Sequence, residues 1–454
     1  MRAFYDSKSK TINDRGIHEL LSDKAKYEAW LKVEMALAKA QAEVNLIPAE
    51  AAKQIEEAAK IENIDFEEMN RIYEEIGHGF VPFLKVLVKA CPKEAGKYVH
   101  YGITTQNVQQ SGQLYGVKQV HSKFLEIIGE ILYNLAELTE KEKNTVMPGR
   151  THGRHAIPIT FGYKSSVWIS ELLSHVERMR ESEKRVFQIM TGGAVGTYAT
   201  MPEVGPAVQK RVAEILDMYP MDVPSRNNQT MKLEYIMNLQ LIASSCHKMA
   251  EEVYQTSLEE IAEVSEGFKE GTVGSSTMPH KVNPKLSKGI IANAQKLYSL
   301  SSVGLYSSAR PYEGDSSRDM VFNGIMEEAL QLMTEILLRM EELTRTLVVH
   351  RTRMKENAGI NAGLDNSEYL MMEVAKKLGK DEAHSLIYEI AIRTAVHGEN
   401  FLNNLVNDNR IKKFFTEKEI ETFIDPENYT GLSSTIASRM SKKAYEVANQ
   451  LKKE

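Results

Sequence analysis

Two long helical patterns flank the segment Gly274-Ser275-Ser276-Thr277-Met278-Pro279-His280-Lys281-Val282-Asn283-Pro284. Its small residues leave the backbone free to move and its N–H groups exposed, and its two prolines prevent a helix from running through. Lys281 and Asn283 supply a cation and an amide, a pair suited to holding a carboxylate. A hydroxyl-bearing loop beside such a clamp suits an enzyme that removes a proton from the carbon next to a carboxylate. The alternative is an ordinary polar surface loop.

This pattern, written Gly-Ser-Ser-x-Met-Pro-x-Lys-x-Asn-Pro, resembles the fingerprint of the fumarase/aspartase superfamily. The chain is similar to the adenylosuccinate lyase and 3-carboxy-cis,cis-muconate cycloisomerase group over nearly its whole length. Residues 21–50, 379–384 and 425–432 resemble the cycloisomerases in particular. The resemblance implies an all-α fold of three helical domains, with a central bundle of long helices that tetramerises.

Composition places the chain among ordinary globular proteins, with 454 residues, 42% hydrophobic and 26% charged. A net charge of −6 gives no basic field for nucleic acid or an anionic membrane surface. Two cysteines, Cys91 and Cys246, are too few for a disulfide framework, so we expect a reducing, cytoplasmic setting. Residues 1–8 lack the apolar core of a signal peptide, and no run of 18 apolar residues occurs.

Apolar residues recur at helical spacing through most of the chain. The clearest case is Val120, Phe124, Ile127, Ile131, Leu135 and Leu138, which predicts a helix of about six turns from Val117. Similar patterns predict helices at residues 22–45, 66–75, 162–190, 229–267, 285–305 and 323–350. We expect an N-terminal helical domain at 1–111, a central bundle at 112–350 and a C-terminal helical domain at 351–454.

A second polar segment, residues 98–110, contains the paired hydroxyls Thr104 and Thr105. At a helix N-terminus, hydroxyls and unsatisfied backbone N–H groups can bind an anion together, although either threonine could also be a simple cap. The family has a carboxylate-binding segment here, with an aspartate where this chain has Asn107. Upstream, Gly77 and Gly79 flank His78, which matches a catalytic histidine of adenylosuccinate lyases. A structural histidine is the alternative.

A third polar segment, residues 148–156, contains His152 and His155. Their spacing of three would suit a metal, but no carboxylate or cysteine lies near at suitable spacing, so we expect no metal. The resemblance identifies Thr151 and His152 as a substrate-contacting pair, with His152 as proton donor or charge-stabilising partner. His155 is then a supporting or structural residue.

The glycine-rich segment 192–198 follows a predicted helix and no strand, which disfavours a dinucleotide site. It resembles the Gly-Ala-Val-Gly-Thr-Tyr turn of adenylosuccinate lyases. Those enzymes carry a Gln-Arg-Asp-Arg run where this chain has Asn228-Gln229-Thr230-Met231. They also place an arginine for the nucleotide phosphate after a Ser-Ser pair, at a position occupied here by Met320, with Arg318 close by.

The superfamily reaction is β-elimination from a succinyl group, usually with release of fumarate. The resemblance implies that Ser275 is the base and that His152, with His78, assists the departing group. Substrate contacts are expected from Thr104, Thr105, Thr151, Ser276, Gln229, Lys281, Asn283 and Arg318. No metal or organic cofactor is required, and loops of three subunits of a homotetramer typically build each site.

We therefore predict a carbon–nitrogen lyase that acts on an N-substituted aspartate and releases fumarate. Adenylosuccinate, a purine-pathway substrate, is the best single named candidate, although the missing arginines disfavour a nucleotide. A 3-carboxy-cis,cis-muconate cycloisomerase is one alternative. A non-catalytic structural protein on the same scaffold is another, disfavoured because Ser275, Lys281 and His152 are all present.

Overall fold

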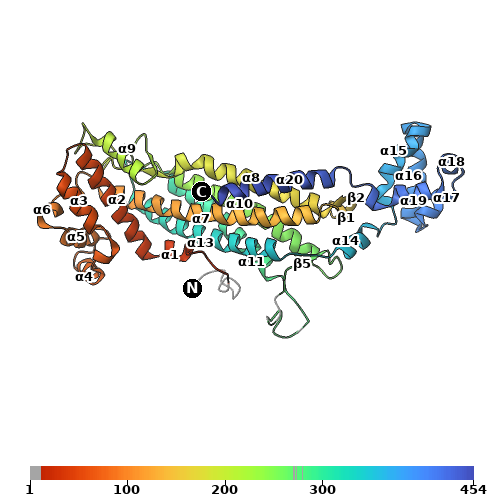
Figure 1. Cartoon of the computed structure of the whole chain (residues 1–454), viewed down its shortest axis with the longest axis horizontal. Helices are drawn as coiled ribbons and strands as arrows, with labels where there is room; N and C mark the ends of the chain where they lie inside the picture. Colours follow the sequence, from red (N-terminus) through yellow and green to blue (C-terminus); the bar gives the residue numbers. More distant parts are fainter. Residues whose placement is uncertain (1–11, 269–270, 272, 279, 454) are drawn as a thin grey trace. The chain divides into compact units, whose positions relative to one another are not determined.

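The computed structural model describes residues 12–268, 271, 273–278 and 280–453. Residues 1–8 and Pro279, on which two of the expectations above rest, lie outside this range. The chain is almost entirely helical, which confirms the all-α prediction (Figure 1). Its contacts divide it into two units: unit 1 comprises residues 1–126, 175–244 and 292–338, and unit 2 comprises residues 127–174, 245–291 and 339–454. The three-domain division remains a prediction.

Five helices supply residues to both units. They are α7 (Thr105–Lys141), α8 (Phe161–Val186), α10 (Thr230–Thr256), α11 (Lys285–Tyr298) and α13 (Ser316–Thr346). Each covers one of the predicted helical patterns, with boundaries that differ. The helix expected from Val117 begins at Thr105, because Asn107 accepts a hydrogen bond from the Thr104 N–H at 3.2 Å and so caps the polar first turn. The pattern expected at 285–305 is interrupted at Ser299, where α12 follows α11.

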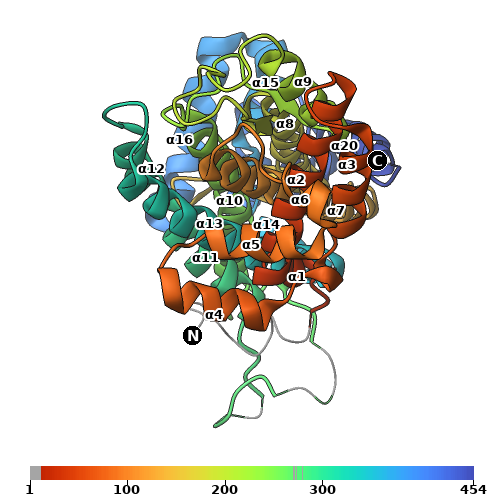
Figure 2. The same cartoon turned by 90° about the vertical axis from the view of Figure 1, so that its left-hand side faces the viewer.

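Unit 1 contains the N-terminal helices (Figure 2). Its remaining elements are α1 (Ile17–Leu20), α2 (Asp23–Glu43), α3 (Ala49–Ala58), η2 (Ile61–Asn63), α4 (Phe66–Ile76), α5 (Val81–Ala90), α6 (Lys93–Gly96), β3 (Gln188–Ile189), α9 (Gly205–Ile215), β4 (Tyr219–Pro220) and α12 (Leu300–Ser308). Ser22 caps α2, since its side chain accepts the Ala25 N–H at 3.2 Å. Trp30 of α2 packs against Phe80 and lies so close to α7 that a Cβ at Gly112 would come within 2.7 Å of its ring.

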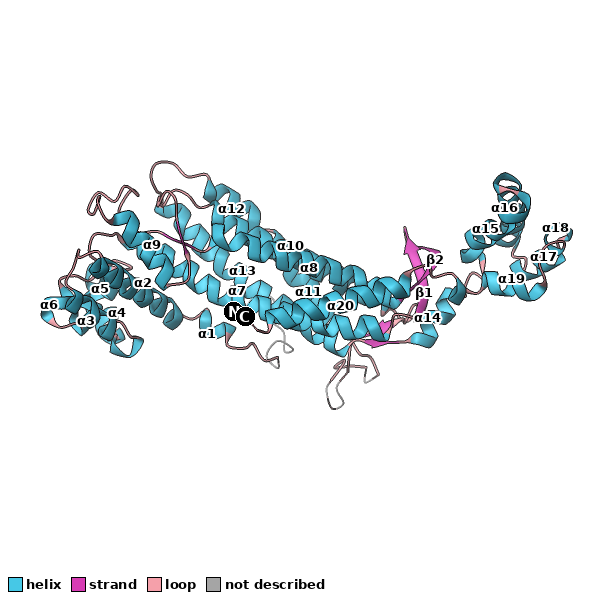
Figure 3. Cartoon of the chain, turned by 45° about the horizontal axis from the view of Figure 1, so that its top comes forward, coloured by secondary structure: helices cyan, strands magenta, loops and turns pink. Residues whose placement is uncertain are grey.

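Unit 2 contains a β-hairpin and the C-terminal helices (Figure 3). Its remaining elements are β1 (Val146–Thr151), β2 (Arg154–Thr160), β5 (Val264–Ser265), β6 (Val348–Val349), α14 (Arg351–Ala358), η3 (Leu364–Asn366), α15 (Ser367–Leu378), α16 (Lys380–His397), α17 (Phe401–Asn407), α18 (Asn409–Lys412), α19 (Glu417–Ile424), η4 (Pro426–Asn428) and α20 (Ser433–Leu451). Helices α15, α16, α17 and α19 share a buried apolar core that includes Leu370, Leu386, Phe401 and Ile420.

The hairpin was not expected from the sequence. Strands β1 and β2 pair antiparallel from Val146 opposite Thr160 to Thr151 opposite Arg154, with an irregularity between Pro148 and Arg150. The helix predicted to continue to 267 instead ends at Thr256, and β5 then pairs with β6. No helix among the described residues is long and apolar enough to cross a lipid bilayer.

Candidate active site

The polar residues expected to form the site divide between the two units. Unit 2 carries Thr151, His152, Ser275, Ser276, Lys281 and Asn283, and unit 1 carries His78, Thr104, Thr105, Gln229 and Arg318. Each group is built locally by different elements.

Ser275 lies in the loop between β5 and α11, and its hydroxyl oxygen faces the backbone. Its Oγ accepts hydrogen bonds from the N–H groups of Met278 at 3.2 Å and of Thr277 at 3.4 Å. Two donated hydrogen bonds lower the free energy of an alkoxide relative to the neutral hydroxyl. Ser275 is half-buried, whereas Ser276 and Lys281 are exposed.

The two ends of this loop are joined to each other. Asn283 donates from Nδ2 to the carbonyl of Gly274 at 3.2 Å, and Lys285 donates from Nζ to the carbonyl of Val273 at 2.8 Å. A Cβ at position 274 would lie 2.5 Å from the carbonyl oxygen of Lys281, so only glycine allows this approach. Asn283 thus has a structural role in the loop, and its second amide N–H remains for a substrate.

His152 occupies the tip of the β1–β2 hairpin. With Thr151 opposite Arg154, the turn has two residues, His152 at φ 53° and Gly153 at φ 72°. Two positive φ values are those of a type I′ turn, in which asparagine and glycine are preferred to histidine. The exposed imidazole is therefore held out from the hairpin at some conformational cost.

A buried ion pair links the hairpin to the start of the serine loop. Arg150 donates to both oxygens of Glu263, at 2.9 and 2.5 Å, and Asn357 donates to the same carboxylate at 2.9 Å. Glu263 is completely buried and directly precedes β5, after which the loop begins. The pair therefore ties the strand that carries His152 to the segment that carries Ser275. Sequence reasoning missed it, since Arg150 and Glu263 are far apart along the chain.

His155 is largely buried, and its Nδ1 lies 3.6 Å from a carboxylate oxygen of Asp365, in agreement with a supporting position. No group of three or more histidine, cysteine, aspartate or glutamate side chains gathers as a metal site in the part of the chain that the structure describes.

In unit 1, Thr104 and Thr105 lie at the N-terminus of α7, as the sequence suggested. Asn107, which is 1% exposed, fixes this end of the helix to the glycine-rich segment. Its Oδ1 accepts the N–H of Gly193 at 3.0 Å, and its Nδ2 lies 3.5 Å from the Gly193 carbonyl oxygen. An aspartate could accept the same N–H but could not donate to the carbonyl.

His78 caps helix α5. Its Nδ1 accepts hydrogen bonds from the N–H groups of Phe80 and Val81, both at 3.1 Å. A ring nitrogen that accepts carries no proton, so the neutral imidazole has its N–H at Nε2, on the exposed side chain. Nδ1 of His78 therefore has a structural role, whereas Nε2 is available to donate to a ligand.

Gln229 and Arg318 have different surroundings. Gln229 is 1% exposed and donates to Gln110 Oε1 at 2.5 Å and to the Arg226 carbonyl at 3.0 Å. Arg318 is half-buried, with Nη1 3.4 Å from Ser317 Oγ. Met320, at the position of the family's phosphate-binding arginine, is 76% exposed.

Comparison with known proteins gives matches along almost the whole chain. A family model described as "Lyase" matches residues 10–296, and one described as "Adenylosuccinate lyase C-terminus" matches residues 363–440. The adenylosuccinate lyase of Methanocaldococcus jannaschii is 32% identical over 433 residues, which is 94% of this chain and 93% of that protein. The N-acetyl-S-(2-succino)cysteine lyase of Enterococcus italicus is 33% identical over 422 residues, 90% of each chain.

A crystal structure of a fumarate lyase from Mesorhizobium sp. BNC1 has a TM-score of 0.86 and 27% identity, and covers 97% of this chain and 99% of that chain. The family models and the near-complete coverage agree with the Gly-Ser-Ser loop. The chain belongs to the lyase family of the fumarase/aspartase superfamily and is a lyase.

Proposed function

We propose that this enzyme releases fumarate by β-elimination from a succinyl compound. Ser275, as the alkoxide, takes a proton from the succinyl methylene, and the resulting electron pair forms the double bond of fumarate. The bond to the leaving nitrogen or sulfur breaks, and that atom takes a proton from His152. The observation that carries this proposal is the pair of backbone N–H groups on Ser275 Oγ, because an unsupported serine is a poor base.

The hard step is the removal of a weakly acidic proton, so the adjacent carboxylate must accept a second negative charge. Preorganised donors are worth about 10²–10³ in rate each at such a position. We assign this role to Lys281 and Asn283 on the loop and to Thr104 and Thr105 at the N-terminus of α7. Ser276 and Thr151 complete the substrate contacts, and His78 assists His152 through its Nε2–H.

These groups come from both units, and we propose that a homotetramer assembles each site from loops of three subunits. The two free, buried cysteines fit the expected cytoplasmic setting.

Among succinyl substrates, we favour one whose leaving group is not a nucleotide. The relatives include enzymes named for adenylosuccinate and for N-acetyl-S-(2-succino)cysteine, so both nitrogen and sulfur leaving atoms occur in the family. This chain has Gln229 and Met320 where the nucleotide enzymes have arginines. Gln229 is buried and engaged with Gln110, so it offers no charge to a phosphate.

The test is fumarate release, followed by absorbance, from adenylosuccinate, argininosuccinate, simple N-substituted aspartates and N-acetyl-S-(2-succino)cysteine. Carboxymuconate, followed by lactone formation, tests the cycloisomerase alternative. We expect fumarate from at least one succinyl compound, and Ser275→Ala should lower kcat about 10²–10⁴-fold, the range for a positioned base. Absence of fumarate from every compound, or full activity of Ser275→Ala, would refute the proposal.

A further inference from the structure

A cavity of about 380 Å³ lies within unit 1, lined by α2, α7, α10 and α13. Its α7 wall carries four glutamines, Gln106, Gln109, Gln110 and Gln113, at positions i, i+3, i+4 and i+7. This spacing places all four amides on one face of the helix. The stripe begins at Gln106, in the first turn of α7, next in sequence to Thr104 and Thr105.

Lys232 of α10 lines the same cavity and is 1% exposed. No carboxylate among the described residues forms an ion pair with its ammonium, which lies 6.0 Å from the centroid of the Phe322 ring. Burial lowers the pKa of Lys232 to about 8, while Asp319 raises it and Arg310 lowers it. The side chain is therefore still mainly charged at neutral pH. A buried charge without a counter-ion is costly, and such groups usually serve a ligand.

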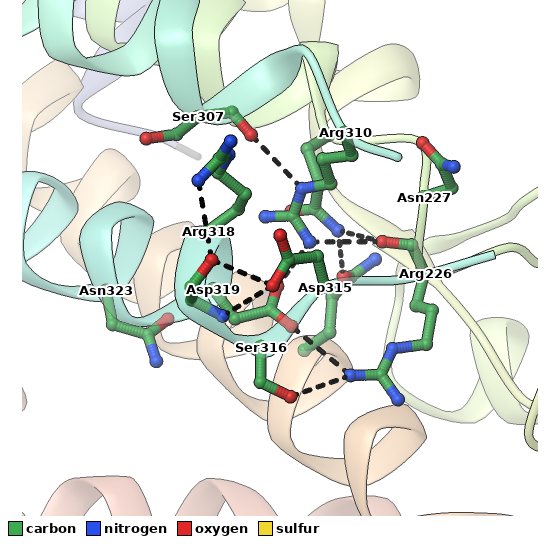
Figure 4. Close-up of polar contacts among 12 residues, drawn as sticks. Arg226, Asn227, Ser307, Arg310, Asp315, Ser316, Arg318, Asp319 and Asn323 are labelled. Carbon is green, nitrogen blue, oxygen red and sulfur yellow. Dashed lines mark hydrogen bonds and ion pairs between the residues drawn. The ribbon is translucent and has the colours of Figure 1, made fainter. Parts of the chain in front are cut away.

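The carboxylate of Asp319 already forms ion pairs with two arginines (Figure 4). Arg310 donates from Nη1 to Asp319 Oδ1 at 2.6 Å, and Arg226 Nη2 lies 3.5 Å from Oδ2 of the same side chain. Asp319 is 6% exposed, and the Arg310 side chain is completely buried. Asp319 is thus directly paired with two guanidinium groups, and it acts on the Lys232 ammonium only as a more distant charge.

The other charges on the cavity do not compensate Lys232. Asp23 pairs with Lys26 at 2.6 Å, and Glu327 is exposed to solvent. The site therefore offers one buried ammonium and the amides of Gln106 and Gln109, which complement a carboxylate and an amide group of a ligand. The amide of Gln110 is engaged with Gln229, and that of Gln113 donates to Asn323.

We propose that this cavity binds the leaving group of the substrate, and that Lys232 selects a leaving group that carries a carboxylate, such as an N-acyl amino acid. This inference rests on the proposed function, and it identifies the substrate as the succinyl derivative of such a compound.

Arg310 does not make the cavity a phosphate site, because it is not among the residues that line the cavity, although its buried Nη2 has no hydrogen-bond partner. Nε donates to the Ser307 carbonyl at 3.2 Å, and Nη1 donates to the Arg226 carbonyl at 3.3 Å as well as to Asp319. A volume of about 380 Å³ is also near the lower end of the roughly 300–1,000 Å³ of small-molecule pockets. Both features favour a compact monoanion over a nucleoside phosphate.

The experiment compares N-acetyl-S-(2-succino)cysteine, its cysteine carboxamide analogue and adenylosuccinate on three enzymes: wild type, Lys232→Met and the control Lys32→Met. Lys32 is exposed on α2 and does not line the cavity. For the wild type we expect the carboxamide to have a kcat/KM about 10- to 100-fold lower, the range for a charged hydrogen bond. Lys232→Met should show the same loss on the carboxylate substrate but stay within about twofold of wild type on the carboxamide.

The role of Lys232 would be overturned if Lys232→Met lost the same kcat/KM on both substrates, or if the wild type had equal kcat/KM on the carboxylate and the carboxamide. A wild-type preference for adenylosuccinate would overturn it as well. If Lys232→Met fails to fold, the wild-type comparison still tests whether the carboxylate of the leaving group is recognised, and equal activity on the carboxamide refutes the proposal. Calorimetric titration with N-acetylcysteine separates the two proposals. Binding that Lys232→Met abolishes and Lys32→Met keeps supports the inference even if no fumarate is formed, whereas the absence of wild-type binding contradicts it.

Discussion

Replacement of His152 by asparagine should separate the stability of the hairpin from catalysis. His152 and Gly153 have φ values of 53° and 72° in the two-residue turn that Thr151 and Arg154 close. Asn-Gly is a preferred sequence for this type I′ turn, so His152→Asn suits the backbone at least as well. It also removes the only group in the turn that can donate a proton as an acid.

The magnitudes follow from these two changes. A residue other than glycine or asparagine costs roughly 1–2 kcal/mol in the left-handed conformation, of which we expect about 1 kcal/mol to be regained. With an unfolding entropy of about 2.1 cal/mol/K per residue, a chain of 454 residues gains only about 1 °C in Tm. The loss of a positioned acid should lower kcat about 10²–10⁴-fold.

The assay is fumarate release together with a thermal unfolding scan of the same preparation. His155→Asn is the matched control, since His155 lies in β2 beside Asp365 and we expect kcat within about threefold of wild type. If His152→Asn keeps its kcat, His152 is not the acid. If its Tm falls by several degrees, the turn argument is wrong.

Three further predictions follow from the contacts. Burial lowers the pKa of Lys232 to about 8 in the folded protein, against 10.5 for an ordinary lysine. Between these two pH values the unfolded chain binds more protons than the folded one, so the free energy of unfolding should rise with pH. In urea titrations, the stability advantage of Lys232→Met over wild type should therefore shrink from pH 7 to pH 10, by up to about 3 kcal/mol; a constant difference would contradict the buried charge. Arg150→Met leaves the Glu263 carboxylate buried and should cost about 3–5 kcal/mol in a denaturant titration, against less than about 1 kcal/mol for Arg211→Met in the exposed pairs with Glu43 and Glu214; equal costs would refute the role of the buried pair. His78→Asp keeps an acceptor for the N–H groups of Phe80 and Val81 and should match the wild-type Tm while losing activity, whereas retained activity would limit His78 to its capping role.

Local sequence was sufficient to predict where the long helices lie, although several of their ends differ in the structure. Ser22 caps α2, and the apolar spacing from Val120 to Leu138 lies within α7, because both signals act over a few residues of the same helix. The Gly274–Pro284 pattern likewise led to the correct family, since loop chemistry of that density recurs only where it has a function.

The tertiary structure alone decided the features that join distant segments. The pairing of Arg150 with Glu263 joins residues 113 positions apart, and no local periodicity encodes it. Lys232 is an unremarkable lysine in the sequence, and only the packing of α7, α10 and α13 around it removes its ammonium from water. Charge follows from residue type, but its energetic cost follows from burial, which the surrounding helices determine together.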